Sequence, residues 1–139
     1  MVAEGIPFLE VGVDCLCIDS ADPSALAAWW QRLVGGEARI DGDGDVLLKG
    51  AGVQLLFAAV PEAKRAKNRL HIDLRATDFE SAVDAALALG AQRADDIYDG
   101  PRWQVLRDPE GNEFCILRPR RDAESERSEG DNSSSSQPR

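Results

Sequence analysis

Residues 70–78 read LHIDLRATD and residues 14–22 read DCLCIDSAD, so the chain carries one pattern twice. In both copies an apolar stretch with interspersed polar residues leads to an aspartate at which a helix can start. The shift that lays Asp22 on Asp78 also lays Cys15 on His71, the only histidine of the chain. The repeat predicts two copies of one module, and the unlike residues at matched positions point to a binding site between the copies.

The composition is that of a single folded domain. The chain has 139 residues, of which 43% are hydrophobic, and it can bury a core without metal or disulfide staples. No apolar run approaches the roughly 20 residues of a membrane span, and the N-terminus lacks the features of a secretory signal. We therefore expect a cytoplasmic protein whose three cysteines are reduced.

The charge disfavours two classes of partner. A net charge of -9 argues against binding to nucleic acid or to an anionic membrane, because both select clustered lysine and arginine. Basic residues do gather between Lys64 and Arg69, but no aromatic residue lies among them. We expect a small-molecule ligand instead.

The chain is expected to end in a disordered tail. Residues 120–139 are dominated by charged residues and serine, and such a segment buries too little apolar surface to offset its ordering entropy. The folded domain is accordingly expected to span residues 1–119.

The first copy is typical of a βαβββ module. Asp22 and Pro23 suit the N-cap and the first turn of a helix, and Gly35 and Gly36 end its three- and four-residue periodicity. The strands are expected at Val11–Asp19, Glu37–Ile40, Asp45–Lys49 and Val53–Val60.

The second copy repeats this order. Asp78 caps a helix that ends at Gly90, and a tight turn at residues 108–112 joins the last two strands. The strands are expected at Arg69–Ala76, Gln92–Tyr98, Trp103–Arg107 and Glu113–Leu117. Neither module can bury a sheet face alone. The predicted fold is therefore α+β, with two βαβββ modules paired about a pseudo-twofold axis and a curved mixed sheet around a cleft.

Three segments resemble the vicinal oxygen chelate superfamily, which contains glyoxalase I, the fosfomycin and bleomycin resistance proteins and the extradiol dioxygenases. These segments are residues 21–30, 67–74 and 108–115, and the likeness extends over residues 11–118. Together they resemble the glyoxalase-like domain branch that is common in actinobacteria. The resemblance implies the paired-module fold, and it implies a homodimer because dimers are common in this superfamily.

The resemblance also identifies four positions at which metal-dependent members carry their ligands. In this chain they are occupied by Cys15, Leu56, His71 and Cys115. Hard cations need oxygen ligands, and none of these four side chains supplies one. We expect the usual metal site to be lost and no cofactor to be bound.

Three interpretations of these residues remain open. In the first, the cysteines are packed thiols and His71 is a hydrogen-bonded residue that lines a pocket. In the second, Cys15, His71 and Cys115 bind zinc, with an open fourth position beside Leu56. In the third, His71 is a general base and Glu113 is its partner, because strand alternation points Glu113 and Cys115 to one face.

Further residues complete the predicted ligand site. Gln54 shares a strand face with Leu56. Arg69 precedes the strand of His71, and it could clamp a carboxylate of the ligand or pair with Asp73 or Glu113. Trp103 could stack on a planar ligand or join the core. With Cys15 and Cys115 they would contact the ligand.

The predicted function is that of a small-molecule-binding protein of the glyoxalase and bleomycin-resistance type, without the usual divalent metal. One alternative is an enzyme, either a metal-free lyase or isomerase that uses His71 as general base or a zinc-dependent lyase. Another is a structural module with a vestigial cleft.

Overall fold

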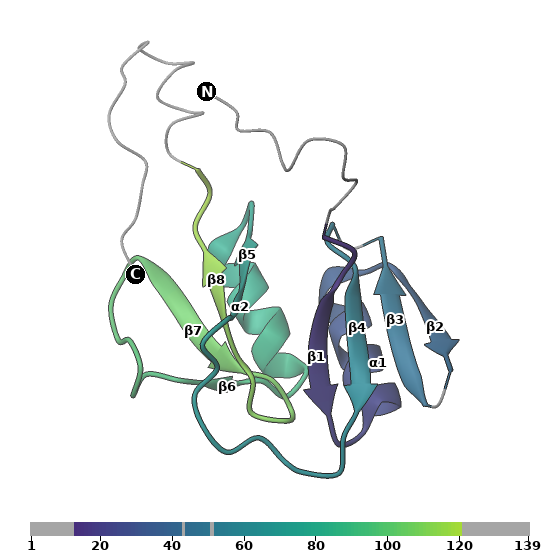
Figure 1. Cartoon of the computed structure of the whole chain (residues 1–139). Helices are drawn as coiled ribbons and strands as arrows, with labels where there is room; N and C mark the ends of the chain where they lie inside the picture. Colours follow the sequence, from purple (N-terminus) through teal and green to yellow (C-terminus); the bar gives the residue numbers. More distant parts are fainter. Residues whose placement is uncertain (1–12, 43, 51, 121–139) are drawn as a thin grey trace, which may run out of the picture. The chain divides into compact units, whose positions relative to one another are not determined.

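The computed structural model describes residues 13–42, 44–50 and 52–120. The chain divides into two compact units, Met1–Ala63 and Lys64–Arg139, and each unit holds one βαβββ module (Figure 1). The predicted α+β class and the predicted duplication are confirmed. The predicted tail, except for Arg120, lies outside the described residues, as does the start of the first predicted strand.

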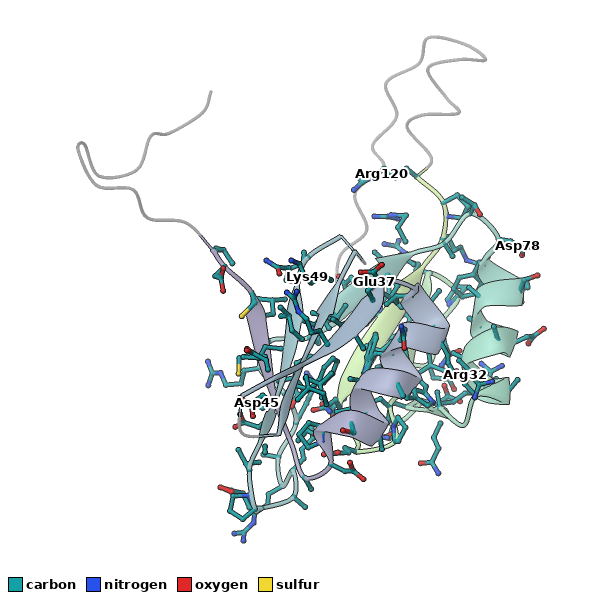
Figure 2. All side chains as sticks on the ribbon, turned by 90° about the vertical axis from the view of Figure 1, so that its right-hand side faces the viewer. Arg32, Glu37, Asp45, Lys49, Asp78 and Arg120 are labelled. Carbon is teal, nitrogen blue, oxygen red and sulfur yellow. The ribbon has the colours of Figure 1, made fainter. Side chains whose placement is uncertain are left out.

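The first module is a four-stranded mixed sheet with one helix. Its elements are β1 (Leu16–Ser20), α1 (Pro23–Val34), β2 (Glu37–Asp41), β3 (Asp45–Lys49) and β4 (Leu55–Ala59). The strand order is β1-β4-β3-β2, in which β1 and β4 are parallel and the other pairs are antiparallel. Glu37 and Lys49, labelled in Figure 2, are register partners at one end of the β2–β3 ladder.

Helix α1 begins and ends where the sequence predicts. The Asp22 carboxylate accepts a hydrogen bond from the Ala25 N–H at 3.2 Å, and Gly35 takes a φ of 82° just beyond the last turn. Both tryptophans of the helix, Trp29 and Trp30, are buried and meet edge to face with their ring centroids 5.4 Å apart. The core of this module therefore lies between α1 and one face of its sheet.

The second module has the same topology. Its elements are β5 (Ile72–Arg75), α2 (Phe79–Ala88), β6 (Gln92–Arg93), β7 (Trp103–Arg107) and β8 (Glu113–Leu117). The strand order is β5-β8-β7-β6, with β5 parallel to β8. Asp78, labelled at the start of α2 in Figure 2, caps the helix by accepting hydrogen bonds from the N–H and the hydroxyl of Ser81. The predicted cap is confirmed.

The predicted strand Gln92–Tyr98 is wrong over most of its length, because β6 ends at Arg93. The chain turns after Ala94, whose carbonyl accepts hydrogen bonds from the N–H groups of Ile97 and Tyr98. The polar side chain of Asp95 accepts a hydrogen bond from Gln104 of β7. Alternation alone would extend β6 as far as Tyr98. The chain instead leaves the strand at this turn.

No helix within the described ranges is long and apolar enough to cross a membrane.

Candidate functional site

Helix α2 packs on one face of the second sheet. We call the opposite side its open face because no helix in the described part of this module covers it, although most of its strand residues are buried. Because side chains alternate along a strand, partners in register point to the same side. Asp73 is the register partner of Cys115, and Cys115 is also the partner of Val105. His71 lies two positions before Asp73, directly ahead of β5, and so shares this face.

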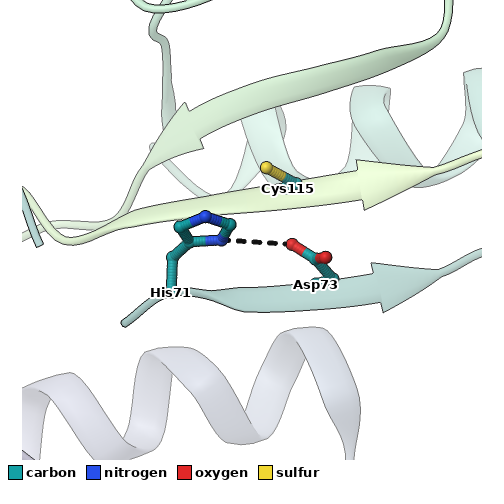
Figure 3. Close-up of side chains that lie close together, drawn as sticks. All are labelled: His71, Asp73 and Cys115. Atoms are coloured by element: carbon teal, nitrogen blue, oxygen red, sulfur yellow. Dashed lines mark hydrogen bonds and ion pairs between the residues drawn. The ribbon is translucent and has the colours of Figure 1, made fainter. Parts of the chain in front are cut away.

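Three side chains on the open face form a cluster, which we call the His–Asp–Cys cluster: His71, Asp73 and Cys115. One ligand-type atom from each lies within 4.8 Å of the others (Figure 3). The side chain of His71 is 31% exposed and that of Asp73 19%, whereas Cys115 is only 4% exposed. The cluster thus combines two partly exposed polar side chains, those of His71 and Asp73, with the buried thiol of Cys115.

The imidazole of His71 is oriented by Asp73. Its Nδ1 lies 3.2 Å from Oδ1 of Asp73, as the dashed line in Figure 3 shows. A carboxylate only accepts, so this contact places a proton on Nδ1. In the neutral ring Nε2 then keeps its lone pair, and it can accept a proton or bind a metal ion.

Burial raises the pKa of the Cys115 thiol, and the positive charge of Lys67 opposes that rise. The neutral thiol is therefore favoured in the folded module unless a cation or a base takes its proton.

Glu113 occupies a different place from the one predicted for it. Its Oε1 accepts a hydrogen bond from the Asn68 N–H at 2.9 Å, and its Oε2 lies 3.1 Å from Nζ of Lys64 and 3.8 Å from Nε of Arg107. Burial alone would raise the pKa of Glu113, but the contacts from Asn68 and Lys64 bring it below its usual value. The carboxylate that contacts His71 is that of Asp73, so the predicted pairing of His71 with Glu113 is corrected.

The turn before β8 fixes the position of Glu113. Buried Asp108 accepts hydrogen bonds at 2.9 Å from the N–H groups of Glu110 and Asn112, and Gly111 takes a φ of 88°. The Asn68 side chain donates to the Asn112 side chain at 3.1 Å. The loop that leads to His71 is therefore anchored to the turn that leads to Cys115.

Trp103 lies on the open face but is only 7% exposed. Its ring stacks on Tyr98, with the centroids 4.1 Å apart and the planes at 16°. It belongs to a small apolar cluster on this face, together with Ala94, Val105, Cys115 and Leu117. Of the two predicted roles of Trp103, the structure shows burial in the core, and Tyr98 occupies the ring face on which it stacks.

Arg69 is exposed, and it forms no ion pair within the described part of the chain. The structural pairs predicted for it with Asp73 or Glu113 are not formed, since Asp73 contacts His71 and Glu113 contacts Lys64. Its predicted contact with a ligand stays a prediction.

The remaining predicted residues belong to the first module. Cys15 is half-buried immediately before β1, and Leu56 is the register partner of Cys17. The Gln54 side chain donates a hydrogen bond to the backbone carbonyl of Asp14 at 3.1 Å, and its predicted contact with a ligand stays a prediction. Within the second module, Asp73 lies close to both His71 and Cys115, and the predicted contributions of Cys15 and Leu56 stay predictions.

Sequence reasoning missed the contact of Asp73 with His71 and the stacking of Tyr98 on Trp103. The first had a usable signal, because residues at i and i+2 of a strand share a face and His71 and Asp73 have that spacing. The second had none, since a local turn replaces the predicted strand that would have carried Tyr98.

Comparisons with known proteins agree with this architecture. The sequence profile of the glyoxalase-like domain family matches residues 15–117. No curated protein sequence matches the chain.

Several solved structures share the fold. A mutant of FosX, the fosfomycin resistance protein of Listeria monocytogenes, in complex with Mn(II) and 1S,2S-dihydroxypropylphosphonic acid, is 14% identical with a TM-score of 0.66, over 86% of this chain and 98% of that one. A glyoxalase/bleomycin resistance protein/dioxygenase family enzyme from Burkholderia phytofirmans is 20% identical with a TM-score of 0.63, over 76% and 96%. TioX from Micromonospora sp. ML1 is 18% identical with a TM-score of 0.54, over 77% and 98%.

Because the family profile spans most of the chain and the two modules have the matching topology, the chain belongs to the glyoxalase-like domain family of the vicinal oxygen chelate superfamily.

Proposed function

We propose that the protein binds a small molecule on the open face of the second sheet, at the His–Asp–Cys cluster. The observation that carries this proposal is the His71–Asp73 contact, which holds a partly exposed imidazole in one orientation beside an apolar floor. A few oriented polar groups on an apolar surface are typical of small-molecule sites. A relative of the same fold, FosX, is described in complex with a small phosphonic acid, and this supports the same class of ligand here.

The proposed binding does not use a hard divalent cation. Only Asp73 in the cluster offers an oxygen donor, whereas Mg²⁺ and Mn²⁺ prefer sites made mostly of oxygen ligands. The Mn(II) of FosX is a property of that protein.

A single histidine makes the proposal directly testable. With ¹³C-labelled histidine, the protein gives ring signals from His71 alone. We expect at least one class among carboxylates, phosphonates and planar aromatics to shift these signals saturably, both with and without added Mg²⁺. The shift should be lost in Asp73→Ala, whereas Asp84→Ala, which removes an exposed aspartate on α2, should retain it. Ligands that bind without moving the His71 signals would refute this location.

A second candidate function is favoured by the same contact. An imidazole whose Nδ1 is held by a carboxylate is arranged as a general base through Nε2, so the protein would catalyse proton abstraction as a metal-free lyase or isomerase. Once a ligand is known, exchange of its acidic C–H for deuterium in D₂O should require His71. His71→Gln should stop the exchange, and unchanged exchange in that variant would exclude this mechanism.

A further inference from the structure

On the basis of the small-molecule binding proposed above, we infer that the ligand of the open face carries a single acidic group, a carboxylate or a phosphonate, and that the ammonium group of Lys67 binds it. Lys67 then determines which ligands are accepted, whether or not His71 acts as a base. It belongs to residues 64–69, which we call the basic loop.

The basic loop concentrates positive charge in an acidic protein. Four of the 16 lysine and arginine residues of the chain lie in these six positions, although the net charge is -9. A negatively charged protein repels anions at long range, so an anionic ligand needs a cation close to its site. The basic loop can supply one only through a side chain that is not already paired with a carboxylate.

Of the two lysines of the basic loop, Lys64 is paired and Lys67 is not. Nζ of Lys64 lies 3.1 Å from Oε2 of Glu113, so its charge is balanced. Nζ of Lys67 donates to the carbonyl of Asn68 at 3.3 Å, and Lys67 forms no ion pair within the described ranges of the chain. An ammonium group has three donors, so this contact leaves Lys67 able to donate to an anion as well.

The backbone next to Lys67 is fixed on the open face. The N–H of the peptide group that joins Lys67 to Asn68 donates to Oε1 of Glu113 at 2.9 Å. Glu113 and Cys115 point to the same side of β8. They lie two strand positions, about 7 Å, apart, and the four-carbon stem of a lysine covers such a distance. The ammonium of Lys67 can therefore reach the His–Asp–Cys cluster.

The charge of Lys67 acts at this cluster. Burial raises the pKa of the Cys115 thiol, and the positive charge of Lys67 opposes the rise. Among the described residues, Lys67 is the cation whose charge is felt at this thiol. This agrees with the position that the anchored backbone gives it, and it distinguishes Lys67 from the two arginines of the basic loop.

These positions define the class of ligand. A carboxylate or a phosphonate at Lys67 accepts a charge-assisted hydrogen bond from the ammonium group. The rest of the ligand then extends toward His71, whose Nδ1 lies 3.2 Å from the carboxylate of Asp73. The negative charge of Asp73 repels a second acidic group at that end. A ligand with one acidic group and an uncharged body therefore fits better than one with an acidic group at each end.

The test compares acids with their uncharged amides on the full-length protein. With ¹³C-labelled histidine, the ring signals of His71 are followed during titration with acetate, benzoate, phenylphosphonate, acetamide and benzamide at constant ionic strength. We expect at least one acid to shift these signals saturably. It should bind about 10- to 100-fold more tightly than its amide or, for phenylphosphonate, than benzamide, as one hydrogen bond to a charged group would give.

Variants identify the residue that recognises the charge. Lys67→Met should weaken binding of the acid about 10- to 100-fold and leave binding of the amide unchanged, whereas Lys67→Arg should retain the preference for the acid. The matched control is Lys49→Met, which removes the same charge from an exposed position at the end of β3. It should bind the acid as the wild type does. Far-UV circular dichroism shows that each variant keeps the fold.

The outcomes separate this inference from the small-molecule proposal. Equal affinities for acid and amide, an unchanged affinity for the acid in Lys67→Met, or an equal loss in Lys49→Met overturns the role of Lys67 and leaves binding at the open face standing. If none of the five compounds moves the His71 signals, the role of Lys67 is rejected and the small-molecule proposal loses support as well.

Discussion

The backbone N–H of Asn68 donates to Oε1 of Glu113 at 2.9 Å, although 45 positions of sequence separate the two residues. The other carboxylate oxygen meets the ammonium of Lys64. Together they tie the loop before β5 to the first residue of β8. The start of β5, which His71 directly precedes, is thus held beside the start of β8 by a carboxylate that takes no part in the His–Asp–Cys cluster.

Removing the charge of Glu113 should loosen this anchor. Glutamine can still accept from the Asn68 N–H, but it leaves Lys64 without its charged partner, so Glu113→Gln should lower the free energy of unfolding by about 2 kcal/mol. Urea unfolding measures the loss, and hydrogen exchange at Asn68 should become faster. The matched control is Glu62→Gln, which changes an exposed glutamate. Equal stabilities of the two variants would contradict the anchoring role.

A methyl group at position 100 should disturb the aromatic stack. A Cβ on Gly100 would collide with the ring and hydroxyl of Tyr98, which is itself held against Trp103. Gly100→Ala should therefore displace Tyr98, change the near-UV circular dichroism and cost about 1–3 kcal/mol of stability. Asp99→Ala, one residue earlier and exposed, should leave the spectrum unchanged. An unaltered spectrum in Gly100→Ala would show that the loop can relax without moving the stack.

The cap of α2 should make stability depend on pH. Hydrogen bonds from the N–H and hydroxyl of Ser81 hold the pKa of Asp78 below its usual value. A lowered pKa stabilises the fold above the unfolded-state pKa, and this contribution is lost as the pH falls through the folded-state pKa. The melting temperature of the wild type should thus exceed that of Asp78→Asn near neutral pH, and the gap should close in acid. A gap independent of pH would argue against the charged cap.

The cysteines should react in order of exposure. Cys17 is exposed and Cys115 is buried, so iodoacetamide should label Cys17 first and Cys115 only in denaturant. Burial, and next the carboxylate of Asp19, raise the pKa of Cys17, so its labelling rate should keep rising at a pH where a free thiol has levelled off. Peptide mass spectrometry follows each site. Early labelling of Cys115 in the folded protein would contradict the packing described above.

The sequence predicted the parts of the fold that depend on local chemistry. Asp22 and Asp78 cap their helices as expected. The carboxylate of an aspartate that precedes a helix accepts a hydrogen bond from an N–H group of the first turn, and this interaction does not depend on the rest of the fold. The repeat itself predicted the shared topology of the modules. The pairing of the modules about a twofold axis, with a cleft between them, stays a prediction.

The details of the site depend on tertiary contacts that the pattern does not contain. Alternation places Asp73 and Glu113 on one face, but it does not say which carboxylate reaches His71. That choice is made by the loop carrying Lys64 and Asn68, which engages Glu113 and leaves Asp73 beside the ring. The early end of β6 has a local cause: the N–H groups of Ile97 and Tyr98 donate to the Ala94 carbonyl and form a turn, although the same residues could extend a strand.

The turn built around Asp108 also bears on the order in which the second module assembles. It joins β7 to β8 through a few residues, so this hairpin closes at little entropic cost. The parallel pairing of β5 with β8 has to wait until the long connection that contains α2 is in place. We therefore expect His71 to meet Cys115 late in folding. A molecule that bridges the two would bind the finished module only, and it would stabilise the native state by an amount that grows with its concentration relative to its dissociation constant.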